Sequence, residues 1–174
     1  MNISDELLIA QNHSREQALK ISEFACSSPA HFKTLMRCFL SNEYRLAQRA
    51  AWSVSWAAQK YPELIKPYIK DLVAQLPKKD VHNAVTRNSI RILQQIKIPE
   101  ELHGDLMNSC FGFVESPSTP VAIKAFSLTT LFNLSKFYPE IKNELKLVIE
   151  ERWNSESAAF KSKGRHILKA LNTK

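Results

Sequence analysis

The chain has 174 residues, of which 44% are hydrophobic and 24% are charged, with a formal net charge of +7. These values are typical of one globular domain with its own core, and the three glycines allow neither a GxGxxG nor a GxxxxGK[ST] phosphate-binding loop. The N-terminal residues show no signal-peptide pattern, and no apolar run approaches the roughly 18 residues of a membrane span. The three cysteines lack CxxC spacing, so we expect a cytoplasmic protein with reduced thiols and with no membrane contact, metal or cofactor.

Apolar residues recur at helical spacing along most of the chain, and no segment shows sustained period-two alternation. We expect a lead-in segment at 1–13 with a short turn at 4–11. First helices, which we name A helices, are predicted at 14–26, 43–60, 81–97, 119–137 and 157–171. Second helices, the B helices, are predicted at 29–40, 62–76, 99–115 and 139–152. The fold class is therefore all-α, with about four helix pairs and a terminal A helix.

Capping residues mark several of the expected helix starts. These starts are Ser14 with Gln17 three residues on, Asp80, Thr119-Pro120, and Ser155 or Ser157. Within the third B helix, Gly104 and Gly112 are expected to interrupt the helical pattern.

A corner motif recurs between A and B helices. A lysine is followed two or three residues later by Pro-Glu in the stretches KYPEL, KIPEE and KFYPE. Lysine suits a helix C-terminus, proline suits a first helical position, and glutamate suits a first turn. The helix-opening prolines stand at 29, 62, 99 and 139, so the unit recurs every 33 to 40 residues. Such a period is typical of a helical solenoid.

The longest units resemble HEAT repeats. The resemblance rests on RAAWSVSWAAQKYPELIKPYIKDLVAQL and VAIKAFSLTTLFNLSKFYPEIKNELKLVIEE, with RNSIRILQQIKIPEELHGDLMNSCFGFV as a weaker copy. It spans about residues 14–171 and implies a single domain, 1–174, with a right-handed, armadillo-like α-α superhelix. Members of this family mostly serve as scaffolds and adaptors. One subset, the HEAT-like alkylpurine DNA glycosylases, binds DNA and excises damaged bases, but no catalytic motif of that subset maps onto this chain.

Charge divides unequally between the two kinds of helix. The predicted A helices sum to +11 and the predicted B helices to −3, so we expect one basic layer and one near-neutral to acidic layer. Residues 157–174 form a basic capping helix, which serves either as a patch for an anionic partner or as a solvated end of the array. The candidate anion-binding residues are Arg45, Arg49, Arg87, Arg91, Lys124, Lys161, Lys163, Arg165 and Lys169.

Aromatic and reactive side chains complete the sequence evidence. Trp52 and Trp56 are one helical turn apart and are either partner contacts or core residues. Trp153 is expected to cover the junction with the capping helix, and Cys110 is expected in the core. The histidines show no metal-ligand spacing.

Together, these patterns favour a small cytoplasmic HEAT-repeat interaction or scaffold module. We expect it to bind a protein partner, with no catalytic activity and no small-molecule substrate. The alternative is a nucleic-acid-binding module related to the HEAT-like glycosylases, which would contact phosphates through the basic A helices and the C-terminal helix.

Overall fold

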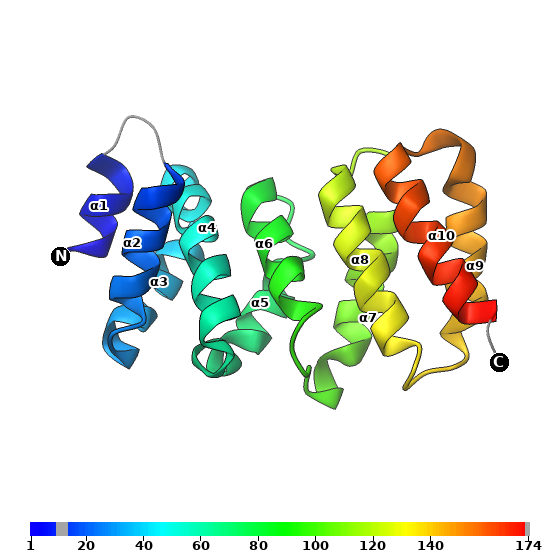
Figure 1. Ribbon diagram of the computed structural model, residues 1–174, viewed down its shortest axis with the longest axis horizontal. Coiled ribbons are helices and arrows are strands. Elements are labelled where there is room, and N and C mark those ends of the chain that lie inside the picture. Colours follow the sequence, from blue (N-terminus) through cyan, green and yellow to red (C-terminus); the bar gives the residue numbers. More distant parts are fainter. Residues whose placement is uncertain (10–13, 173–174) are drawn as a thin grey trace. The chain divides into compact units, whose positions relative to one another are not determined.

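A computed structural model describes residues 1–9 and 14–172 of the chain. Within these ranges it contains ten α-helices and three short 3-10 helices and no strand, which confirms the all-α prediction (Figure 1). The part of the chain that is described holds no helix long and apolar enough to cross a membrane. The chain forms two compact units, Met1–Ile92 and Leu93–Lys174, and each is described by itself. That the whole chain is one domain stays a prediction.

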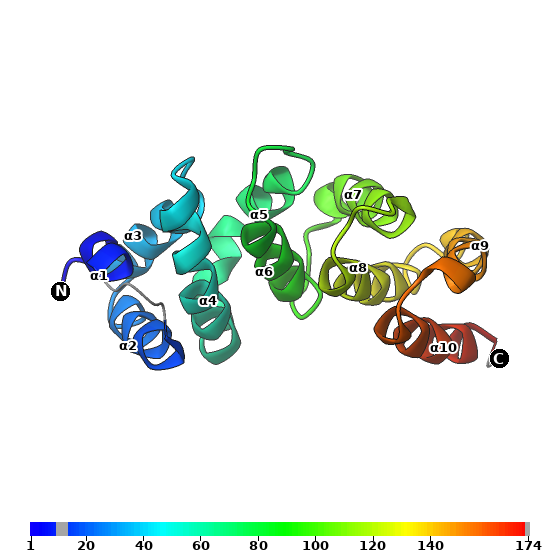
Figure 2. The same cartoon turned by 90° about the horizontal axis from the view of Figure 1, so that it is seen from above.

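The first unit has two layers of helices. Its elements are α1 (Ile3–Ile9), α2 (Arg15–Ala25), α3 (Pro29–Phe39), α4 (Tyr44–Lys60), the 3-10 helix η1 (Pro62–Tyr68), α5 (Ile69–Gln75) and α6 (Asn83–Leu93), whose last residue belongs to the second unit. Helix α4 packs against α2 and α3, and α1 packs against α4. In Figure 2, α2, α4 and α6 form one row, while α3 and α5 form the other, as the alternation of A and B helices predicts.

The second unit repeats this arrangement. Its elements are the 3-10 helix η2 (Glu100–Leu102), α7 (His103–Glu115), α8 (Val121–Leu134), α9 (Ile141–Arg152), the 3-10 helix η3 (Trp153–Ser155) and α10 (Ala158–Asn172). Helix α8 packs against both α7 and α10, and α9 packs against α8 and α10. Because α8 has neighbours on two sides, apolar residues on more than one of its faces are buried, among them Ile123, Leu128 and Leu131.

The prolines of the corner motif lie where the prediction places them. Pro29 is the first residue of α3, and the Ser28 hydroxyl caps that helix by accepting from the His31 N–H at 3.1 Å. Pro62 opens η1, and Pro99 directly precedes η2. Pro139 lies in the turn before α9. Each proline therefore stands at a corner where its missing N–H leaves no helical hydrogen bond unmade.

The lysines of the motif follow the prediction only once. Lys60 is the last residue of α4. Lys97 and Lys136 lie beyond the ends of α6 and α8, which close at Leu93 and Leu134. The expectation that a lysine closes each A helix was therefore wrong at two of the three corners. Helix α6 ends four residues before Lys97, and helix α8 ends two residues before Lys136.

Three further features of the helices differ from the sequence prediction: the type of one helix, the cap of another and the continuity of a third. The second B helix opens as a 3-10 helix because Pro67 has no N–H to donate within it. Helix α6 begins at Asn83, where the His82 Nδ1 accepts from the Ala84 N–H at 2.8 Å, so Asp80 does not cap it. Helix α7 runs without a break through Gly104 and Gly112, so the expected interruption was wrong. Neither glycine has a positive φ.

Helix α1 is the lead-in element. Ile3 and Leu7 are buried, and the Gln17 side chain donates to the Glu6 carbonyl at 2.6 Å. The Ser14 hydroxyl accepts from the Gln17 N–H at 3.1 Å, which confirms the predicted cap of α2. Residues 10–13 of the expected lead-in lie outside the described residues.

Candidate interaction surfaces

The candidate cations differ widely in exposure. Arg45, Arg87, Arg165 and Lys169 are exposed, Arg91, Lys161 and Lys163 are half-buried, and Arg49 and Lys124 are buried. The sequence named all nine as candidate contacts for an anionic partner. The structure corrects that list at the two buried positions, while anion binding by the other seven stays a prediction.

Arg49 is part of the interior of the first unit. Its Nη1 donates to the Leu7 carbonyl at 2.7 Å, and the residue is only 8% exposed. Burial, together with the nearby charge of Arg45, lowers the pKa of Arg49 below its ordinary value. Arg49 therefore joins α4 to α1 and is not available to an external anion.

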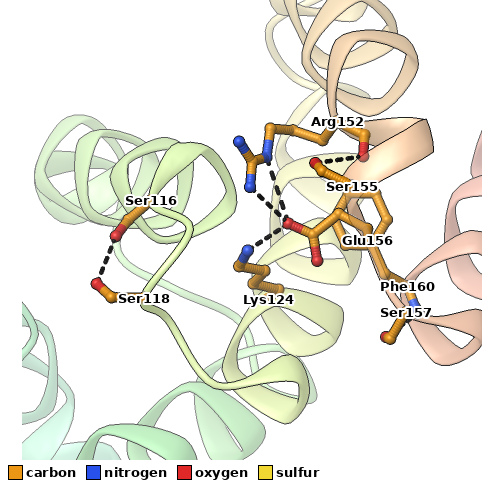
Figure 3. A network of polar contacts seen from close by, with 8 residues as sticks. All are labelled: Ser116, Ser118, Lys124, Arg152, Ser155, Glu156, Ser157 and Phe160. Atoms are coloured by element: carbon orange, nitrogen blue, oxygen red, sulfur yellow. Dashed lines mark hydrogen bonds and ion pairs between the residues drawn. The ribbon is translucent and has the colours of Figure 1, made fainter.

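Lys124 is the second buried cation, and it lies in an ion-pair network (Figure 3). Its Nζ contacts Glu156 Oε1, and both side chains are almost fully buried. The Arg152 Nη2 lies 2.9 Å from the same oxygen. Burial would raise the pKa of Glu156, but the hydrogen bonds and charges of Lys124 and Arg152 outweigh it and hold that pKa below its ordinary value. The network joins α8, α9 and the segment before α10, so Lys124 has a structural partner already.

The tryptophans are half-buried. The Arg15 guanidinium lies 5.4 Å from the centroid of the Trp56 ring, a cation–π contact between α2 and α4. Trp153 packs against α10, where a Cβ added at Gly164 would lie 3.3 Å from its Cζ3. The prediction that Trp153 covers the junction with the C-terminal helix is therefore confirmed.

Charge is segregated between the two layers of the second unit. The described helices α4, α6, α8 and α10 contain no aspartate or glutamate, although together they carry ten lysines and arginines. On the other layer of the second unit, η2 and α7 carry Glu100, Glu101, Asp105 and Glu115, all exposed, and no lysine or arginine. The predicted contrast between A and B helices therefore holds within this unit.

A pocket of about 710 Å³ opens in the second unit and was not predicted. It lies where the chain leaves α6 and enters α7, against the C-terminal end of α8. Its apolar lining comes from Leu93, Ile96, Ile98, Pro99, Leu106, Leu134, Phe137 and Tyr138. Phe137 is 69% exposed. The only signal of the pocket in the sequence is this apolar residue at the last position of the predicted helix 119–137.

His103 forms part of the pocket wall and has both ring nitrogens occupied. Its Nε2 lies 3.0 Å from the Ile98 carbonyl, which can only accept, so the proton sits on Nε2. The Nδ1 then accepts from the Tyr138 hydroxyl at 3.1 Å. These bonds fix the loop before α7 to the turn after α8, and they shape the pocket instead of supplying a reactive group.

Cys110 is buried in the core of the second unit. Burial raises the pKa of the Cys110 thiol to about 12, in agreement with the predicted core position. No group of three histidine, cysteine or acidic side chains that could hold a metal occurs among the described residues. His13 lies outside them.

Comparison with known proteins gives one match. A family model described as a HEAT repeat domain matches residues 5–171. No curated protein and no solved structure matches the chain.

Proposed function

This chain belongs to the HEAT repeat family, and we propose that it is an interaction module that binds a protein partner in the cytoplasm and carries out no reaction of its own. A helical repeat scaffold presents surfaces instead of a reaction centre. The pocket beside Phe137 is the single observation that supports a protein partner most directly.

The pocket offers the contacts that an apolar anchor residue needs. Its volume of about 710 Å³ lies in the range of known ligand pockets. Phe137 is largely exposed at 69%, although burying a phenylalanine typically stabilises by about 1.5–3 kcal/mol. A partner side chain that enters this pocket would cover Phe137 and recover part of that free energy.

Charges near the anchor define the partner segment further. Lys97 and Glu100 both line the pocket, and both are exposed. Neither forms an ion pair with another described residue. The segment that fits is therefore a short stretch of a partner protein with a leucine or aromatic anchor, flanked by one residue of each charge.

The proposal that the chain is not an enzyme is supported by the state of three candidate nucleophiles and bases, Cys38, Cys110 and His103. Cys110 and Cys38 are buried. Both nitrogens of His103 are engaged in structural hydrogen bonds. Side chains in this state support a structural role for the residues that otherwise carry acid–base or nucleophilic chemistry.

Two matched variants test the proposal. Phe137→Ser removes the exposed ring at the pocket, whereas Leu147→Ser removes another exposed apolar side chain, 57% exposed, from α9. We expect a partner captured from cell extract by the natural chain to be lost with Phe137→Ser and retained with Leu147→Ser. Equal capture by both variants, or equal loss from both, would contradict a role for the pocket.

A further inference from the structure

Three arginines on helices α4 and α6 of the first unit have no acidic partner among the described residues. Arg45 on α4 and Arg87 and Arg91 on α6 form no ion pair with any described residue, whereas Lys20, Lys60 and Lys66 in the same unit each pair with a glutamate. We name Arg45, Arg87, Arg91 and Tyr44 the arginine face.

Neighbouring helices carry this face. The rings of Tyr44 and His82, at the starts of α4 and α6, contact edge to face with centroids 4.3 Å apart. Figures 1 and 2 both place α4 beside α6. Burial and the charge of Arg87 lower the pKa of His82 below its ordinary value, which agrees with a position of Arg87 close to this ring pair. The nearest acidic residues in the sequence, Glu43 and Asp80, lie before the two helices and form no ion pair with the arginines.

The residue types of the arginine face favour a ligand that carries phosphate groups. Arginine presents a planar fork of donors that binds phosphate oxygens in pairs. Tyr44 adds an aromatic side chain that is 63% exposed, directly next to Arg45. Cations with an interleaved exposed aromatic ring are the pattern with which proteins hold single-stranded nucleic acids, where phosphates meet the cations and a base stacks on the ring.

We infer that the arginine face binds single-stranded nucleic acid, with Arg45, Arg87 and Arg91 on the phosphates and Tyr44 against a base. An acidic protein segment would satisfy the arginines but would leave the exposed ring of Tyr44 unused. None of the four residues of the face lines the pocket of the second unit, and binding here does not depend on the proposed protein partner.

Fluorescence anisotropy with the whole chain and a labelled single-stranded oligonucleotide tests this inference. For three phosphate contacts, the affinity should fall with salt with a log–log slope of about 2 in magnitude. Arg45→Ala/Arg87→Ala should lower the affinity at low salt about tenfold or more and reduce the slope to about 0.7. Tyr44→Leu should lower the affinity several-fold and leave the slope unchanged, because it removes stacking and no charge.

A charge-matched control separates this face from the general positive charge of the chain. Lys33→Ala/Arg37→Ala removes two exposed cations from α3, on the other layer of the same unit. We expect this control to bind almost as tightly as the natural chain. Equal losses in the two double variants, or no binding at low salt, would overturn the inference. So would displacement of the oligonucleotide by polyglutamate as efficiently as by unlabelled oligonucleotide.

Discussion

The buried carboxylate of Glu156 gives the sharpest test of the fold. In Glu156→Gln the side chain keeps its size but loses its charge, while Lys124, which is 2% exposed, stays in place. Removing one partner of a buried ion pair costs about 3–5 kcal/mol, because the remaining charge is left uncompensated. The glutamine oxygen can still accept one hydrogen bond, so we expect the lower end, about 3 kcal/mol.

Urea unfolding followed by circular dichroism measures this loss. With a slope of about 1–3 kcal/mol per molar urea, the midpoint should fall by about 1 M or more. Glu150→Gln, which changes an exposed carboxylate on α9, serves as the control and should change stability by less than about 0.5 kcal/mol. Adding Lys124→Met to Glu156→Gln should recover part of the loss, because the stranded charge is then absent. Equal midpoints for the Glu156 and Glu150 variants would refute the reasoning.

Three other predictions follow from the same structure. The pKa of folded Glu156 lies below its ordinary value of 4.5, so its stabilising contribution is present above that value and is lost as the pH falls through the folded-state pKa; acid titration of Glu156→Gln should lack this component. Gly112→Ala should stabilise by about 0.5–1 kcal/mol in thermal unfolding, because nothing lies within 4 Å of the added Cβ in helix α7. Gly164→Ala should instead destabilise by about 1–3 kcal/mol, because its Cβ would lie 2.9 Å from Ile149 Cγ2.

Much of the fold could be predicted because corners and apolar stripes are local signals. Proline, serine and the i, i+4 spacing act within a few residues, and they located most of the helices to within a few residues and the cap at Ser14. The position of Trp153 also followed, since it lies between α9 and α10 and has both as neighbours.

The burial of Lys124 and Arg49 could not be predicted, because it depends on partners far along the chain. Lys124 lies 32 residues from Glu156, and Arg49 lies 42 residues from Leu7. Helix α8 is apolar on several sides, so its sequence does not indicate which face meets α10. A lysine on such a helix is therefore predicted to lie at the surface, although packing buries Lys124 in the folded protein.

The pocket and the place of Tyr44 in the arginine face were not predicted for a related reason, although Arg45, Arg87 and Arg91 were predicted as anion-binding candidates. Phe137 and Ile98 line the same pocket because a loop and a turn come together in space. Neither segment carries a periodic pattern that would predict this. Tyr44 was not among the predicted contact residues, since its contact with His82 joins the starts of two helices whose rotation the sequence leaves open.

Helix α1 is a seven-residue element with two buried apolar residues, Ile3 and Leu7, and it supplies the acceptor for the Arg49 guanidinium. A shortened chain that starts at Ser14 would expose the apolar surface that Ile3 and Leu7 cover, and it would remove the Leu7 carbonyl that accepts from the buried Arg49 guanidinium. Such a chain would keep every complete helix pair and would still tend to aggregate. Helix α1 therefore determines whether the first unit stays folded and soluble on its own.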